Sequence, residues 1–255
     1  MGDPVRIQLC GPLVLRIAGA RVEGRLPGRQ GELLLAYLVC HRGAPVSRER
    51  LIDAIWPRGA PPAANSALSA LISKVRRALD TDWIEGRSEI VLRLPGAAFV
   101  DLEAAREAVH RAESAIALEH WSDAWGPARV ALHTANRGVL VGLEAPWIDA
   151  IRHEVEGIRL RALESVAAAG LGLGGPELAS AERSARRLIE HDPYNESGYC
   201  YLMETLARRD QIAEALRTYE RLRAFLRDGL GIPPGEAVQE LHLRLLGRRS
   251  EVGEP

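Results

Sequence analysis

The stretch NSALSALISKVRRALD, residues 65–80, combines an apolar stripe with a face of small and cationic side chains. Its apolar residues recur at i, i+3, i+4, i+7 and i+11, the spacing of one helical face. They are Leu68, Leu71, Ile72, Val75 and Leu79. At about 100° per residue, the opposite face carries Ser66, Ser69, Ala70, Ser73 and Arg77, with Lys74 and Arg76 on its flanks. Asn65 is suited to cap the start, so the stretch predicts an amphipathic helix.

This hydrophilic face allows two interpretations. In one, the helix lies on the protein surface and its cations are simply solvated. In the other, the small face enters the major groove of DNA, which is about 12 Å wide and admits one helix. Serine hydroxyls both donate and accept hydrogen bonds, so the three serines suit base edges or phosphates. Arg77 then pairs with a guanine or a phosphate, while Lys74 and Arg76 meet the two DNA backbones beside the groove.

The overall composition is that of a globular protein. The chain has 255 residues, of which 47% are hydrophobic and 26% are charged, and this excludes a disordered chain. No apolar run approaches the ~20 residues that cross a bilayer, and the first residues lack the pattern of a secretory signal. The 3 cysteines are far apart and indicate neither a disulfide framework nor a zinc site. We expect a cytoplasmic protein without a metal, a cofactor or a membrane partner.

The charged residues are unevenly distributed, although the net charge is only -1. Residues 1–100 hold 14 basic and 9 acidic side chains, whereas residues 101–255 hold 19 basic and 25 acidic ones. A basic first part followed by an acidic second part is typical of a nucleic-acid-binding domain joined to a domain with another role.

The first hundred residues predict a small α+β domain. Two runs rich in β-branched residues, within residues 5–24, indicate a short antiparallel sheet. Helices are predicted from about Gln30 to His41, from Ser47 to the stop at Pro57, and over residues 65–80. The run DWIEGRSEIVLRLPG, residues 82–96, has two extended segments around EGRS and predicts a hairpin with Arg87 at its tip. Arg87 is then placed to reach a minor groove or its phosphates.

From Asp101 onward, helical patterns replace strand patterns. They cover roughly residues 101–118, 121–135, 147–169, 177–191, 195–208, 211–227 and 235–246. Ala181, Ala185 and Leu188 recur 34 residues later as Ala215, Tyr219 and Leu222. Thirty-four residues is the period of tetratricopeptide repeats. The pattern predicts stacked helical hairpins, with a third and degenerate repeat around residues 124–131.

Motifs typical of enzymes are missing from the sequence. The glycine-rich run GLGLGGP, residues 170–176, lies between two helical patterns, whereas a dinucleotide fingerprint needs a preceding strand and a P-loop needs a Gly-Lys-Ser/Thr ending. We expect this run to be a flexible connection. No G-x-S-x-G or H-E-x-x-H motif is present, and the 7 histidines are scattered. We therefore predict no catalytic residue and no metal ligand.

Two long stretches resemble a known family. LPGRQGELLLAYLVCHRGAPVSRERLIDAIWP, followed by NSALSALISKVRRAL, resembles the N-terminal domain of the actinobacterial antibiotic regulatory protein (SARP) family, a winged helix-turn-helix. ALRTYERLRAFLRDGLGIPPGE resembles the bacterial transcriptional activation domain that follows it in that family. The resemblance implies a winged helix-turn-helix domain over residues 1–98 and an all-α, tetratricopeptide-like domain over residues 99–255. It implies that the helix from Asn65 to Leu79 is the recognition helix and that the wing surrounds residues 86–88.

The resemblance also implies a function. Members of this family regulate transcription, usually as activators that bind direct repeats near promoters, dimerise on DNA and contact RNA polymerase through its sigma factor region. The residues expected to contact double-stranded DNA are Asn65, Ser66, Ser69, Ser73, Lys74, Arg76, Arg77 and Arg87. Two alternatives stay open. One is a helical-repeat scaffold whose first domain has weak DNA binding, and the other is a sensor with a small-molecule ligand in the groove of the repeats.

Overall fold

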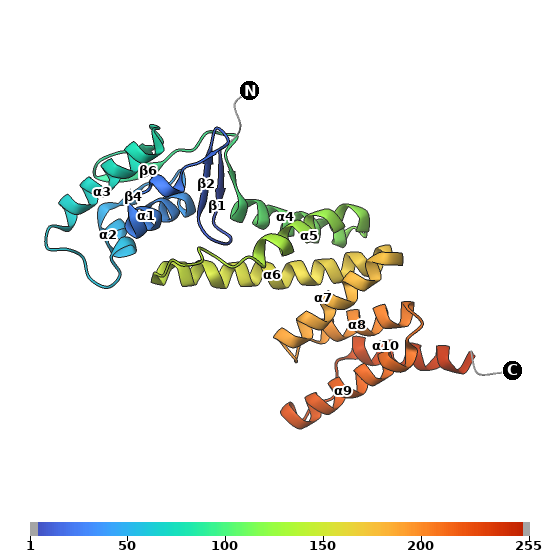
Figure 1. The fold of residues 1–255 in the computed structure, drawn as a ribbon. Coiled ribbons are helices and arrows are strands. Elements are labelled where there is room, and N and C mark those ends of the chain that lie inside the picture. The colour runs from blue at the N-terminus through green and yellow to red at the C-terminus, as the bar shows by residue number, and fades with distance from the viewer. Residues whose placement is uncertain (1–4, 252–255) are drawn as a thin grey trace. The chain divides into compact units, whose positions relative to one another are not determined.

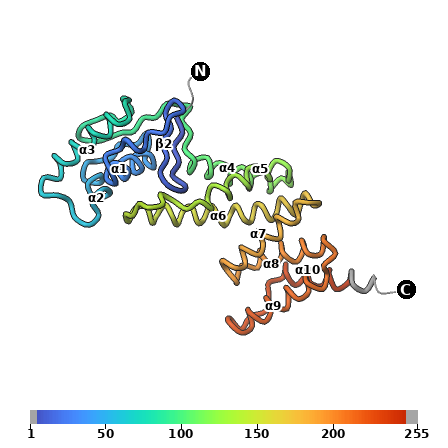
Figure 2. Tube along the Cα trace, viewed as in Figure 1, coloured from blue at the N-terminus to red at the C-terminus, as the bar shows by residue number. Residues whose placement is uncertain are grey.

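The structure is a computed structural model that describes residues 5–251 (Figures 1 and 2). Contacts along the chain divide it into two units. The first unit contains Met1–Ala105 and Thr134–Gly157, and the second contains Arg106–His133 and Ile158–Pro255. The chain therefore leaves the first unit after residue 105 and returns to it at residue 134. Among the described residues, none of the helices has the length and the apolar character needed to cross a membrane.

The first unit begins with the expected antiparallel strands. Strand β1 (Arg6–Gln8) pairs antiparallel with β2 (Val14–Ile17), and β2 pairs antiparallel with β3 (Ala20–Arg21). A fourth strand, β7 (Phe99–Val100), adds to the other edge of β1 in parallel, with Ile7 opposite Val100. The sheet order is β3-β2-β1-β7. This parallel strand was not predicted, because two residues are too few to form a recognisable pattern in the sequence.

Three helices and a hairpin follow in the predicted order. They are α1 (Gly28–Cys40), α2 (Arg48–Ile55), α3 (Ala64–Leu79), β5 (Ile84–Glu85) and β6 (Glu89–Leu92). Strand β4 (Val46–Ser47) pairs with β6 to complete a three-stranded sheet. Ser47 caps α2 as expected, since its hydroxyl accepts a hydrogen bond of 3.3 Å from the Arg50 backbone N–H. The arrangement is a winged helix-turn-helix, with the β5–β6 hairpin as the wing (Figure 1).

A later segment of the chain completes the first unit. The backbone N–H groups of Leu140 and Val141 donate to the carbonyl oxygens of Leu9 and Gly11, at 2.8 and 2.9 Å. These bonds extend the β1–β2 turn with residues 140–141. The indole N–H of Trp147 donates to the carbonyl oxygen of Ala54 near the end of α2, at 3.2 Å. Residues 134–157 thus supply part of the framework that supports α2.

The second unit consists of stacked helices. Three of them have one end in the first unit: α4 (Asp101–Ala117), α5 (Trp121–Ala135) and α6 (Pro146–Leu173). The others are α7 (Leu178–His191), α8 (Glu196–Arg208), α9 (Ile212–Leu230) and α10 (Glu236–Glu251). Helix α7 packs on α8, and α8 packs on α9 and α10. The residues that define the 34-residue repeat are all buried: Ala181, Ala185, Leu188, Ala215, Tyr219 and Leu222. The predicted repeat is therefore the core of these helical hairpins.

The glycine-rich run at residues 170–176 differs from its prediction. Helix α6 continues to Leu173, so the first four residues of the run are helical and are not a flexible connection. Gly172 packs against the ring of Trp121, and Gly170 packs against Trp125 and Ala181. A Cβ at Gly172 would overlap the Trp121 ring, and a Cβ at Gly170 would lie only 3.0 to 3.2 Å from its nearest neighbours. These glycines are helical because close packing with other helices outweighs their low helix propensity.

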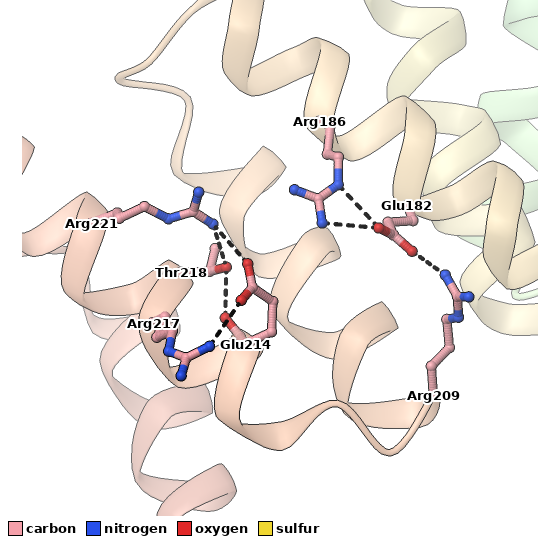
Figure 3. Close-up of polar contacts among 7 residues, drawn as sticks. All are labelled: Glu182, Arg186, Arg209, Glu214, Arg217, Thr218 and Arg221. Atoms are coloured by element: carbon pink, nitrogen blue, oxygen red, sulfur yellow. Dashed lines mark hydrogen bonds and ion pairs between the residues drawn. The ribbon is translucent and has the colours of Figure 1, made fainter.

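Ion pairs lie on the surfaces of the helices in the second unit, both within a helix and between neighbouring helices. Figure 3 shows Glu182 of α7 between Arg186, at 2.9 Å, and Arg209, which follows α8. In α9, Glu214 lies 3.6 Å from Arg217 and 3.7 Å from Arg221. Exposed pairs of this kind stabilise a protein by only about 0–1 kcal/mol each. The buried apolar cluster, rather than these pairs, therefore holds the hairpins together.

Candidate DNA interface

Helix α3 exposes the predicted hydrophilic face. Its buried residues are Leu68, Leu71, Ile72, Val75 and Leu79, as the apolar stripe predicted. Ser66, Ser69, Ser73, Lys74 and Arg77 are exposed on the rest of its surface. Burial of the stripe against α1 and α2 fixes the rotation of the helix about its axis. The sequence pattern and the fold therefore agree on which side of α3 is available to a partner.

The start of α3 differs from the prediction in one detail. Asn65 was expected to cap the helix, but the helix begins at Ala64 and the capping position belongs to Ala63, without a side-chain hydrogen bond. The Asn65 side chain has a different partner, because its Oδ1 accepts a hydrogen bond of 2.9 Å from Nε of Arg48. Asn65 is exposed at the beginning of the hydrophilic face, where it is held by another helix.

Two of the serines bind the backbone of their own helix. Ser69 Oγ donates to the carbonyl oxygen of Asn65, and Ser73 Oγ donates to that of Ser69, both at 2.9 Å. A hydroxyl that donates inward keeps its acceptor lone pairs for an outside donor. Ser69 Oγ already accepts from Arg48 at 2.8 Å. Ser73 therefore offers a free acceptor at the surface of α3, whereas Ser69 is part of an internal network.

The two neighbouring arginines near the end of α3 have different environments. Arg76 is half-buried, and its guanidinium donates to the carbonyl oxygens of Ile84 and Gly86, at 2.9 and 3.1 Å. It thereby attaches the wing to α3. Arg77 is exposed, and its side chain has no hydrogen bond or ion pair with the described residues. Of the two, Arg77 is the one that is available to DNA, and a phosphate contact by Arg76 stays a prediction.

The wing is a tight hairpin with a cation at its tip. Ile84 pairs with Leu92 and Glu85 pairs with Val91 across the two strands. Gly86 has a φ of 90°, a conformation that side chains other than glycine rarely adopt. Arg87 follows it and is exposed. Within the described part of the chain, the side chains of Arg87, Lys74 and Arg77 have no partner, so each cation can reach a phosphate.

Sequence reasoning missed one residue of this region. Arg48, the first residue of α2, donates to Asn65 and Ser69 of α3 and to the carbonyl oxygen of Arg87 in the wing. Its partners are 17, 21 and 39 residues away along the chain. A local pattern carries no information about such distant partners. Only the fold brings the start of α2, the start of α3 and the wing together.

A cleft lies on another side of α2 in the first unit. It has a volume of about 540 Å³, and its walls include the aromatic rings of Tyr37, Trp56 and Trp147 with Arg50 and Asp53 on α2. Such a volume falls in the range of small-molecule sites. Among the described residues, no group of three or more His, Cys, Asp or Glu side chains is arranged to hold a metal ion. The ligand-sensor alternative had placed its site elsewhere, in the repeats.

Comparison with known families agrees with this architecture. Residues 25–96 match the family described as transcriptional regulatory protein, C terminal. Residues 100–246 match the family described as bacterial transcriptional activator domain. The second match covers more than half of the chain. The two matches occur in the order that the resemblance in the sequence implied.

Individual proteins are similar over most of this chain. The regulatory protein AfsR of Streptomyces coelicolor is 31% identical over 85% of this chain, which spans 22% of AfsR. The transcriptional regulatory protein MoaR1 of Mycobacterium bovis is 25% identical over 95% of this chain, which spans 79% of MoaR1. Both relatives are named as regulatory proteins.

A solved structure has the same fold. The chain of Mycobacterium tuberculosis EmbR in complex with a low affinity phosphopeptide superposes with a TM-score of 0.78 over 96% of this chain, at 24% identity. This chain spans 65% of that EmbR chain, and at this identity the likeness shows the fold alone. One assignment follows from both family matches, the relatives and the fold, which is a winged helix-turn-helix followed by helical repeats. The chain belongs to the SARP family of transcriptional regulators.

Proposed function

We propose that this regulator reads specific DNA sequences with the exposed face of α3, which enters the major groove while the wing contacts the adjacent backbone. One observation carries the proposal. Ser66, Ser73 and Arg77 share an exposed face of α3 whose apolar side is buried, so the face is free and its orientation is fixed. Small side chains, with a guanidinium that has no partner among the described residues, suit close approach to base edges.

The cations then divide into two roles. Arg77 lies on the reading face, where a guanidinium binds a guanine through two hydrogen bonds. Lys74 and Arg87 lie beside that face and at the wing tip, where they neutralise phosphates. Phosphate contacts provide sequence-independent affinity, and this affinity falls as salt rises. The binding energy therefore comes largely from Lys74 and Arg87, and the choice of sequence comes from α3.

We further propose activation of transcription as the outcome of binding. The match of residues 100–246 to an activator domain supports it. In this proposal two copies bind direct repeats near a promoter, and the helical repeats contact RNA polymerase through its sigma factor region. The protein then acts in the cytoplasm, where it meets both DNA and polymerase.

Fluorescence anisotropy with labelled DNA tests the reading role of α3. DNA fragments from the region upstream of the protein's own gene, and a scrambled duplex, are titrated with the wild type, Arg77→Ala and Arg25→Ala. Arg77→Ala is expected to weaken specific binding by about 1–3 kcal/mol. Arg25→Ala is the matched control, because Arg25 is exposed in the same unit and its substitution removes the same charge. Equal specific affinities of the wild type and Arg77→Ala would remove Arg77 from the reading role.

A second candidate function is favoured by the cleft beside α2. Three aromatic rings, together with the charged side chains of Asp53 and Arg50, suit a planar molecule that carries polar groups. A regulator gated by such a molecule binds it in the first unit and not in the repeats. Thermal unfolding with indole-3-carboxylate as a probe tests this, because a ligand of the folded state raises the melting temperature. No rise for the wild type, or an equal rise for Trp147→Ala, would exclude this use of the cleft.

A further inference from the structure

We infer that Arg48 is a positioning residue, which joins the recognition helix and the wing into one reading unit and acts through them without touching DNA. The inference rests on the proposed reading of DNA by α3. It assigns a role to a residue that lies outside both elements, at the first position of α2.

The guanidinium of Arg48 binds both elements at the same time. Its Nε donates to Oδ1 of Asn65 at 2.9 Å, and its Nη2 donates to the carbonyl oxygen of Asn65 at 2.7 Å and to Oγ of Ser69 at 2.8 Å. Its Nη1 donates to the carbonyl oxygen of Arg87 at 3.1 Å. A guanidinium has five N–H donors in a rigid plane, and all three of its nitrogens are engaged here. Arg48 is thus directed toward the protein.

These contacts hold the start of the exposed face of α3 and the tip of the wing. Asn65 and Ser69 begin the exposed face of α3, ahead of Ser73 and Arg77. Strand β5 pairs with β6 at two positions, Ile84 with Leu92 and Glu85 with Val91. Arg76 holds the carbonyl oxygen of Gly86 from α3, and Arg48 holds that of Arg87 from α2. Two arginines on different helices thereby fix successive carbonyl groups of the wing.

A direct phosphate contact by Arg48 is the competing explanation, and the two make different predictions. A phosphate contact depends mainly on the positive charge, so a lysine substitutes for it. A positioning role depends on the planar fork that reaches acceptors on two elements, and a lysine ammonium does not reproduce it. The charge-conserving substitution therefore separates the two roles.

The first test compares Arg48→Ala, Arg48→Lys and Arg25→Ala in DNA binding at several salt concentrations. Arg25 is a control in the same unit, since its exposed side chain has no partner among the described residues. A positioning role for Arg48 predicts that both Arg48 variants lose about tenfold in affinity for specific DNA. It also predicts unchanged affinity for scrambled DNA and an unchanged slope of log K against log salt. If Arg48→Lys restores specific binding, or if Arg48→Ala reduces the slope by about 0.9, the inference is overturned.

A second test does not involve DNA, so it distinguishes a failure of this inference from a failure of the proposed function. Hydrogen–deuterium exchange of the free protein is measured for the wild type and both Arg48 variants. Positioning predicts faster exchange in residues 84–89 for both variants, with unchanged exchange in the second unit. Unchanged exchange in the wing of both variants would refute the role of Arg48. If exchange in the wing of both variants is faster but the wild type shows no specific DNA binding, only the proposed function is refuted.

Discussion

Gly172 lies so close to the indole ring of Trp121 that a methyl group on the glycine would overlap the ring. The two residues come from α6 and from the start of α5. The missing side chain allows the helix backbone to approach an aromatic side chain directly. Packing density, not chain flexibility, explains a glycine at this position.

Gly172→Ala is therefore expected to destabilise the protein by about 1–3 kcal/mol, the usual cost of overpacking. Gly157→Ala is the matched control in the same helix, since a Cβ at Gly157 would meet nothing within 4 Å. Alanine favours a helix by about 1 kcal/mol over glycine, so this control is expected to be more stable than the wild type. Urea unfolding of the three proteins provides the measurement. Stabilisation by both substitutions would contradict the packing argument.

Asp101 is expected to be essential for the stability of the first unit. It is buried, its oxygens accept from the backbone N–H groups of Leu9 and Cys10, and it pairs with Arg137 at 2.8 Å. Burial raises the pKa of this carboxyl, although these three partners act to lower the pKa. Asp101→Ala leaves two buried donors and a guanidinium without their acceptor, at a cost of about 3 kcal/mol.

Thermal unfolding measures this effect, with Asp82→Ala as the control. Asp82 is exposed and its side chain has no partner among the described residues. A surface substitution of this kind is expected to stay within about 0.5 kcal/mol of the wild type. Equal melting temperatures for the two variants would show that Asp101 does not connect the β1–β2 turn to α4.

The lowered pKa of His242 predicts that the protein loses stability in acid. Burial lowers the pKa of this histidine below its ordinary value of 6.5, Arg223 adds to the effect, and Glu220 opposes it. The unfolded chain then binds a proton more readily than the folded chain. Stability contributed by the neutral ring is complete above about pH 6.5 and is lost as pH falls through the lowered pKa.

The measurement is the free energy of unfolding in urea at about pH 8 and about pH 5.5. His242→Phe is the comparison, because a phenyl ring can keep the stacking on Tyr219, whose ring centroid lies 3.8 Å from that of His242. The wild type is expected to lose more stability between the two pH values than the variant. Identical losses would mean that His242 does not contribute to the acid sensitivity.

Gly86→Ala is expected to disrupt the wing without affecting the rest of the fold. The residue has a φ of 90°, and a Cβ there would overlap the carbonyl oxygen of Glu89. Backbone strain of this kind costs about 1–3 kcal/mol. Gly96→Ala is the control in the following segment, since a Cβ at Gly96 would meet nothing within 4 Å. Specific DNA affinity is expected to fall for Gly86→Ala alone, with an unchanged helical circular dichroism signal for both variants.

Periodicity in the sequence was sufficient to predict the order of the helices and the buried face of α3. The stripe from Leu68 to Leu79 is buried as expected, because a repeat of 3.6 residues leaves one orientation that removes apolar surface from water. The same reasoning identified Ala181 and Ala215 as equivalent positions in neighbouring hairpins. The exposed positions of Ser66, Ser73 and Arg77 followed from the buried ones.

The details that could not be predicted depend on partners far away in the chain. Ser69 looked equivalent to Ser73 in the sequence, yet it binds Arg48. Arg76 was expected to meet a DNA backbone, yet its guanidinium binds the wing. The helical state of Gly172 depends on Trp121, some fifty residues earlier in the chain. The boundary expected between residues 98 and 99 stays a prediction, whereas chain contacts assign residues 134–157 to the first unit.

The return of residues 134–157 to the first unit restricts how such regulators can be recombined. The chain changes unit at residues 105, 133 and 157, and each of these positions lies inside a helix, in α4, α5 and α6. A chimaera made with one junction at residue 98 would pair the Leu9 turn of one protein with the Leu140 segment of another. No single crossover transfers the whole first unit. Under the proposed function, point substitutions on α3 are therefore a more direct route to new operator preferences than the exchange of intact modules.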